Sequence, residues 1–170
     1  MIERTHNKIG MRSGAIFSDC ETYRYRLWRE WEANKPAICF VMLNPSTADE
    51  LANDPTIERC QRRAIAWGYG RVEIVNLFAL RSTDPRALYG ASADPVGPDN
   101  MTSILKSASL SDKVICAWGK HGAFLGMGDV VMRQLRAIYP GKAHALKLNG
   151  DGTPSHPLYL PYNLEPFRIA

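Results

Sequence analysis

The sequence contains no apolar run of about 18 residues, so it predicts no transmembrane helix. Residues 1–8 lack the apolar core of a signal peptide, and we expect a cytoplasmic protein with no membrane partner. The chain also lacks internal repeats and low-complexity tracts. These absences favour a globular protein that forms one domain over residues 1–170.

Clustered metal ligands are missing as well. The four cysteines (Cys20, Cys39, Cys60 and Cys116) include no C-x-x-C pair, and no two histidines have metal-ligand spacing. Cys39 and Cys116 lie inside apolar runs, where small buried hydrophobic residues are expected. We therefore expect no metal, no cofactor and no disulfide framework.

The basic residues do not form a single run. The formal net charge is +4, which is compatible with a polyanionic partner but does not require one. Three modest groups of arginines occur, and solvated helix or strand faces explain most of them: Arg24/Arg26/Arg29, Arg59/Arg62/Arg63 and Arg81/Arg86.

Strand and helix patterns alternate along most of the chain. Residues 15–17 and 23–28 flank a polar turn and predict an N-terminal β-hairpin. Strands are then expected over residues 38–43, 71–76, 113–118 and 143–148, with helices starting near residues 55, 99 and 123. This order predicts an α/β protein with three α/β/α layers and a mainly parallel central sheet.

Three polar residues follow expected strands. Asn44 comes directly after the strand 38–43, Asn76 ends the strand 71–76, and His156 lies in a proline-flanked loop after the last strand. Because ligands bind beyond the carboxyl ends of parallel strands, these side chains could converge on one ligand. Each also has an ordinary interpretation, as a turn-stabilising asparagine or an exposed loop histidine.

The chemistry of these side chains suits a planar ligand. A carboxamide offers donors and an acceptor to the edge of a base such as uracil or cytosine. A histidine can donate a hydrogen bond to a leaving anion or act as an acid or base. Residues 82–99, the longest irregular segment, form a candidate lid or binding loop.

Four segments resemble, in order, the motifs of the uracil-DNA glycosylase superfamily. Residues 43–45 resemble its first motif, in the mismatch-specific variant where Asn replaces the water-activating Asp. Residues 75–81, followed by Asp84-Pro85, are similar to the strand whose Asn reads the pyrimidine edge. Residues 113–120 resemble the later buried strand with its glycine turn, and residues 155–158 resemble the terminal His-Pro motif.

The resemblance implies roles for particular residues. Asn44 would position the attacking water, His156 would stabilise the departing base and Leu158 would wedge the duplex. The base would stack on the ring of Phe78, Trp67 or Tyr69. The implied catalytic residues are Asn44 and His156, and the implied substrate-binding residues are Pro45, Ser46, Asn76, Phe78, Arg81, Gly119, Pro157 and Leu158. The chain departs from the motifs at Met42-Leu43, which replaces a Gly-rich lead, and at Leu158-Tyr159-Leu160, which replaces a Ser-Pro pair.

A closer resemblance spans almost the whole chain. Segments such as residues 43–49, 54–57, 67–69, 76–79 and 156–160 are similar to a bacterial and phage family, domain of unknown function 1643. That family implies no settled activity. We therefore predict a monomeric, nucleobase-recognising protein with nucleic acid or a nucleotide as partner, which hydrolyses the glycosidic bond of an unusual or modified base. The alternative is a module that binds the base, nucleotide or nucleic acid without cleaving it; a purely protein-binding module would leave Asn44, Asn76 and His156 unexplained.

Overall fold

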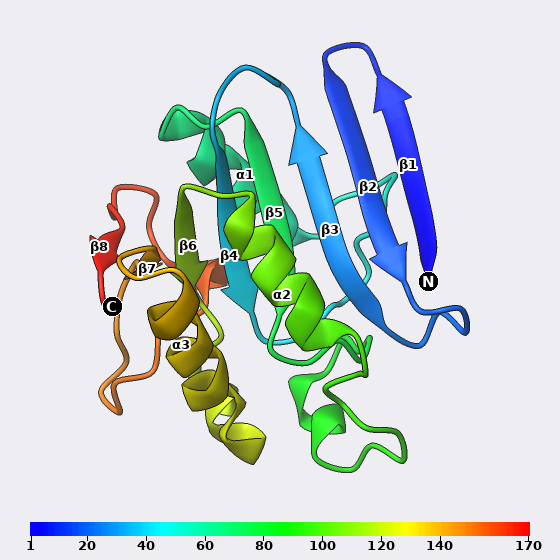
Figure 1. The fold of residues 1–170 in the computed structure, drawn as a ribbon, viewed down its shortest axis with the longest axis vertical. Helices are drawn as coiled ribbons and strands as arrows, with labels where there is room; N and C mark the ends of the chain where they lie inside the picture. Colours follow the sequence, from blue (N-terminus) through cyan, green and yellow to red (C-terminus); the bar gives the residue numbers. More distant parts are fainter.

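The computed structural model describes residues 1–170 and holds one eight-stranded sheet with three α-helices (Figure 1). The strands are β1 (Ile2–Lys8), β2 (Met11–Phe17), β3 (Arg24–Glu30), β4 (Ala37–Met42), β5 (Arg71–Asn76), β6 (Lys113–Cys116), β7 (Ala143–Ala145) and β8 (Phe167–Arg168). The α-helices are α1 (Pro55–Ala66), α2 (Asn100–Ser109) and α3 (Met127–Ile138), and the 3₁₀ helices are η1 (Pro85–Leu88), η2 (Lys120–Gly126) and η3 (Pro157–Tyr159). No helix has the length and apolar character needed to cross a bilayer.

The sheet is mixed, so the expectation of a mainly parallel sheet was wrong. Its order is β1-β2-β3-β5-β4-β6-β7-β8, and only the pairings within β5-β4-β6-β7 are parallel. The expected hairpin is present as β2 and β3, but β1 extends it and β3 joins the main sheet antiparallel to β5. The links between β1, β2 and β3 are short, such as the turn at Gly10 (φ +77°), and permit only antiparallel pairing of these three strands. At the far edge, β8 also runs antiparallel to β7.

Helices cover both faces of the parallel strands, with α2 and α3 on one side and α1 on the other (Figure 1). Alternate residues of β4 divide between these layers: Cys39 and Val41 pack in the cluster that includes α2 and α3, and Ile38 and Phe40 pack in the cluster that includes α1. A strand buried on both faces needs apolar side chains at every position, which explains the continuous apolar run of β4.

Three expected elements have different boundaries, one of which is the strand expected over residues 113–118, which ends at Cys116. The helix expected near residue 123 begins at Met127, because Leu125 (φ +52°) and Gly126 (φ +65°) interrupt helical geometry just before it. The strand expected over residues 143–148 ends at Ala145. Beyond it the chain folds back on itself, with a bridge between Leu148 and Pro154. The helix start at Asp54-Pro55 is confirmed, since the Asp54 carboxylate accepts a hydrogen bond from the Ile57 N–H at 2.9 Å.

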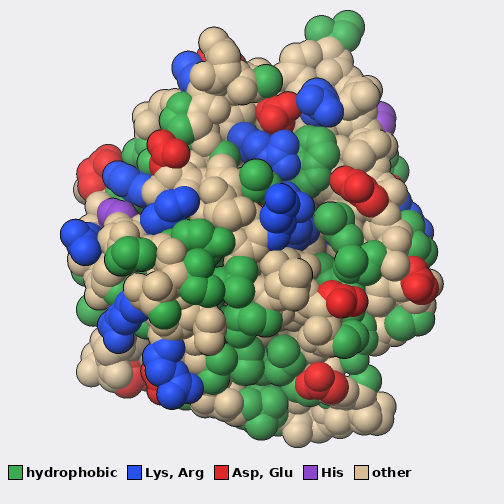
Figure 2. Space-filling model, viewed as in Figure 1, with side chains coloured by type: hydrophobic (Ala, Val, Ile, Leu, Met, Phe, Trp, Pro, Cys, Tyr) green, Lys and Arg blue, Asp and Glu red, His purple; other side chains and the backbone are tan.

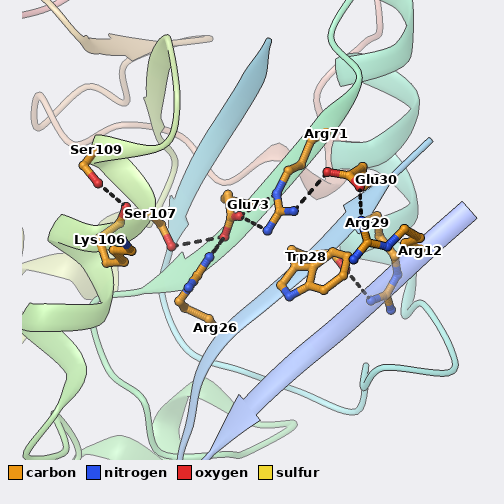
Figure 3. A network of polar contacts seen from close by, with 10 residues as sticks. All are labelled: Arg12, Arg26, Trp28, Arg29, Glu30, Arg71, Glu73, Lys106, Ser107 and Ser109. Atoms are coloured by element: carbon orange, nitrogen blue, oxygen red, sulfur yellow. Dashed lines mark hydrogen bonds and ion pairs between the residues drawn. The ribbon is translucent and has the colours of Figure 1, made fainter. Parts of the chain in front are cut away.

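A buried carboxylate joins three elements (Figure 3). Glu73 on β5 is fully buried and pairs with Arg26 on β3 at 2.9 Å and with Arg71 at 2.6 Å. The hydroxyl of Ser107 on α2 donates to the same carboxylate at 3.2 Å. The two arginines and the hydroxyl together offset the cost of burying this charge.

Charged side chains on the face that carries α2 and α3 are interspersed. Figure 2 shows Lys and Arg scattered there among acidic and apolar side chains, without a continuous basic stripe. The dispersed arrangement that the sequence predicted therefore describes this face.

Candidate functional site

A cavity of about 540 Å³ lies beyond the carboxyl ends of β4, β5 and β6. Its volume falls within the roughly 300–1,000 Å³ typical of small-molecule sites. Six of the ten residues implied by the sequence line it: Asn44, Ser46, Asn76, Gly119, His156 and Leu158. The three segments that carry Asn44, Asn76 and His156 do converge on one cavity, as their positions after strands predicted.

Asn76 is held at the end of β5 with its side chain at the cavity. The residue is only 2% exposed, and its Oδ1 has no hydrogen-bond partner in the protein. Its backbone carbonyl is occupied, because it accepts a hydrogen bond from Asn100 Nδ2 at 2.9 Å. An unpartnered polar atom in a buried position costs about 1–3 kcal/mol. The structure therefore keeps a costly carboxamide beside a cavity, which is an arrangement that a polar ligand would satisfy.

Asn44 uses its amide nitrogen to hold the loop between β5 and η1. Its Nδ2 donates to the carbonyl of Ser82 at 2.8 Å and to that of Pro45 at 3.2 Å. The amide nitrogen thus joins the end of β4 to the segment after β5. Only Oδ1 remains to accept a hydrogen bond from a ligand or a water molecule.

His156 is oriented by a hydrogen bond to its own loop. Its Nδ1 accepts from the backbone N–H of Leu158 at 3.3 Å, so the neutral ring carries its proton on Nε2. Burial lowers the pKa of His156 from its ordinary value, and the nearby Asp54 carboxylate opposes that shift. At neutral pH the ring is therefore an uncharged hydrogen-bond donor at the cavity.

The loop of His156 is fixed by neighbours on both sides. Gly119 adopts a left-handed backbone (φ +74°), and its N–H donates to the carbonyl of Pro154 at 2.8 Å. From α1, Arg59 and Arg63 both donate to the carbonyl of Leu160, and both guanidinium groups lie over the ring of Tyr162. These contacts fix the position of the His156 loop, and Arg59 and Arg63 do so from outside the cavity lining.

The other four implied residues lie outside the cavity lining. Pro45 and Pro157 are buried, and their carbonyls accept hydrogen bonds from neighbouring segments. Phe78 is fully buried and packs against Phe124, with ring centroids 5.6 Å apart. Arg81 is exposed and lies over the ring of Phe17. A stacking role for Phe78 would require it to leave the core.

The cavity is also lined by residues outside the implied set, among them Arg24, Asp54 and Trp118. The sequence had offered Asp54, with Asp49, only as a base that could reach into the site. Trp118 is the one Trp, Tyr or Phe in the lining, and η2 and α3 approach its indole closely because Gly122 and Gly128 have no Cβ to clash with it. The sequence did mark Asp54, because an Asp directly before Pro55 is typical of a helix N-cap. It did not mark Arg24, because a strand arginine is usually solvated.

No group of three His, Cys, Asp or Glu side chains is placed to bind a metal ion. The four cysteines are free, and three of them are buried. Burial raises the pKa of the Cys39, Cys60 and Cys116 thiols, which keeps them protonated at neutral pH.

The comparison with known families gives one match. The model of a family described as protein of unknown function, DUF1643, matches residues 24–158. The chain belongs to the DUF1643 family. The match extends from the start of β3 to η3 and includes every residue that lines the cavity, whereas β1, β2 and β8 lie outside it. None of the curated proteins matches the chain.

Proposed function

We propose that the cavity binds a nucleobase and that the protein hydrolyses the N-glycosidic bond joining this base to its sugar, in DNA or in a nucleotide. The observation that carries the proposal is the buried carboxamide of Asn76, whose Oδ1 lacks a partner at the cavity. A carboxamide matches the paired donor and acceptor on the edge of a pyrimidine. The resemblance to uracil-DNA glycosylases adds to this, because its motifs contribute Asn44, Asn76 and His156 to the same cavity.

In this proposal His156 stabilises the leaving base. The neutral ring presents Nε2–H as a donor, and a carbonyl oxygen of the departing base accepts that hydrogen bond as negative charge develops on it. Because a donor aimed at developing charge acts more strongly in the transition state than in the ground state, it lowers the barrier. Removal of one such donor typically costs about 10²–10³-fold in rate.

Asp54 is the base that activates the water. The amide of Asn44 cannot accept a proton, and a missing general base costs about 10²–10⁴-fold in rate. Asp54 lines the cavity, and only its Oδ1 is engaged, in capping α1. Asp49 is a weaker candidate, because its carboxylate binds the N–H groups of Leu51 and Ala52 outside the cavity lining. Asn44 Oδ1 then orients the water between the sugar and Asp54.

The second candidate function is binding of a base or nucleotide without cleavage. It is favoured by the engagement of Asn44, whose amide nitrogen stabilises the loop at Ser82 rather than facing a reactant. In that case Asp54 serves only to begin α1.

The experiment is a search for abasic sites in single- and double-stranded oligonucleotides that carry uracil, mismatched thymine, hypoxanthine or modified pyrimidines. The corresponding free nucleotides are assayed for release of the base. Cleavage that is lost in Asp54→Asn supports hydrolysis, because Asn caps a helix as well as Asp does and so the fold is retained. Binding without cleavage supports the second candidate, and neither binding nor cleavage on any substrate overturns both.

A further inference from the structure

Three arginines of this protein are almost fully buried, and two of them bind other parts of the protein away from the cavity. Arg29 donates to the side chain of Asn53 and to the backbone carbonyls of Trp28, Asp49 and Ala52. The Nη2 of Arg63 donates to two carbonyls of the C-terminal segment, its Nε and Nη1 have no partner, and the guanidinium lies over the ring of Tyr162. Both therefore have a structural role that explains their burial.

Arg24 is different. It is only 2% exposed, it lines the cavity, and only Nη1 has a hydrogen-bond partner, the carbonyl of Ala48 at 2.5 Å. It takes part in none of the ion pairs of the protein. Burial lowers the pKa of the Arg24 guanidinium to about 10, with Asp54 opposing the shift, so the group remains a cation at neutral pH. A buried cation is normally paired. Arg29 and Arg63 also lack an ion pair, but of the three only Arg24 lines this cavity.

The surroundings of Arg24 offer further donors. The hydroxyl-bearing residues Ser46 and Thr47 directly precede Ala48 and line the cavity, as does Thr56 in the first turn of α1. The N-terminus of a helix attracts anions, and α1 has 12 residues. Asp54 is the one acidic residue in the lining, and it partly counters this positive field.

We propose that Arg24 forms a phosphate subsite in this cavity, so that the ligand is a nucleoside monophosphate unit with its base at Asn76. The inference rests on the proposed nucleobase recognition and adds the class of ligand. A guanidinium with free nitrogens matches two phosphate oxygens at once. The second observation that points to a ligand is independent of charge: Asn76 Oδ1 is buried and unpartnered at the same cavity. One ligand that carries both a base and a phosphate satisfies both residues.

The phosphate can belong to a free nucleotide or to a nucleotide turned out of a strand. Both present the same chemistry to Arg24, and the test separates them. Binding is measured by calorimetry for matched pairs of a nucleoside and its 5′-monophosphate, covering uracil, thymine, cytosine and hypoxanthine. A single-stranded trinucleotide that carries each base at its centre forms the third arm.

For wild type we expect at least one monophosphate to bind about 10- to 100-fold more tightly than its nucleoside, the effect of a charge-assisted hydrogen bond. Arg24→Gln is expected to reduce this ratio to near one while leaving nucleoside affinity unchanged. Arg24→Lys keeps the charge and restores part of the ratio. The matched control Arg62→Gln removes an exposed arginine of α1, which pairs with Glu58, and leaves the ratio unchanged.

A second variant keeps the test decisive if Arg24→Gln fails to fold. Asp54→Asn removes the opposing charge and retains the helix cap, so it should tighten binding of the monophosphate and leave the nucleoside unaffected. Nucleosides that bind as tightly as their monophosphates, in wild type and in Asp54→Asn, overturn the phosphate subsite but leave nucleobase recognition standing. Failure of every nucleoside, nucleotide and trinucleotide to bind overturns both. A trinucleotide that binds more tightly than the monophosphate, with the same loss in Arg24→Gln, assigns the phosphate to a strand.

Discussion

Asn76, the last residue of β5, is the parallel register partner of Met42, the last residue of β4. This alignment places the ends of the two strands at the same edge of the sheet. The backbone N–H groups of Leu77 and Phe78 continue the pairing, donating to the carbonyls of Met42 and Leu43. As a result, the segments that carry Asn44 and Asn76 leave the sheet together and form adjacent walls of the cavity.

The unpartnered carboxamide of Asn76 leads to an unusual prediction, a substitution that stabilises the fold and removes binding. Asn76→Leu replaces the amide with an apolar side chain of similar size. Since it removes a buried acceptor without a partner, we expect the free energy of unfolding to rise by about 1 kcal/mol or more. That corresponds to about 2–4 °C in Tm for a chain of this size. Base or nucleotide binding should be lost in the same variant.

The matched control is Asn100→Leu. Asn100 is also buried and its Oδ1 also has no partner, but its Nδ2 donates to the carbonyls of Asn76 and Leu77, both at 2.9 Å. The same substitution there should lower stability by about 1–3 kcal/mol, because it strands two buried carbonyls. If the Asn76 side chain binds a ligand, thermal melts should show a higher Tm than wild type for Asn76→Leu and a lower Tm for Asn100→Leu. Destabilisation by both would mean that Asn76 has a structural role.

Two substitutions of His156 distinguish the role of Nδ1 from the role of Nε2. In His156→Asn, the amide oxygen can replace Nδ1 as the acceptor for the Leu158 N–H, but nothing replaces Nε2–H. In His156→Gln, the longer side chain can bring an amide N–H close to the Nε2 position. We expect cleavage to fall about 10²–10³-fold in His156→Asn and to be partly retained in His156→Gln. Equal activity of both variants and wild type in single-turnover assays would contradict the assignment.

The lowered pKa of His156 predicts a pH dependence of stability. The folded state holds this ring neutral at pH values where the unfolded chain, with a pKa of 6.5, is already taking up a proton. The stabilisation is therefore complete above pH 6.5 and is lost as the pH falls from there through the folded-state pKa. The loss is at most about 1.4 kcal/mol per pH unit for one proton. Denaturant unfolding of wild type and His156→Gln between pH 5 and 8 should show this slope in wild type alone.

The sequence predicted the parallel part of the fold because local patterns encode it directly. The continuous apolar run of β4 requires cover on both faces, and Asp54-Pro55 marks the first turn of α1. It did not predict β1, because residues 2–8 are polar and mostly exposed in the structure. An edge strand with few buried side chains has no period-2 signal, so it is defined by its pairing with β2 alone.

The site also contains residues that the sequence could predict and residues that it could not. Asn44, Asn76 and His156 could be predicted because each follows a strand, and strand ends meet by topology. Phe78 follows Asn76 by two residues, but its ring turns into the core, a direction that depends on tertiary packing. Arg24 was missed because its distinguishing property is burial at the cavity without an ion-pair partner. That property depends on which side chains surround it, and no spacing in the sequence reveals it.

Glu73 allows a test of how far the site depends on the sheet behind it. Its carboxylate holds Arg26 and Arg71 in a buried network that joins β3 to β5 (Figure 3). Glu73→Gln keeps the shape but removes the charge, which leaves Arg26 without an ion pair, so we expect a loss of about 3–5 kcal/mol in the free energy of unfolding. The control Glu32→Gln breaks the exposed pair with Lys35 and should cost less than about 1 kcal/mol. Glu73 lies in the same strand as Asn76 but does not line the cavity. We therefore expect Glu73→Gln to weaken ligand binding only at temperatures where the fold begins to melt. Weaker binding well below that temperature would instead mean that the network sets the position of Asn76.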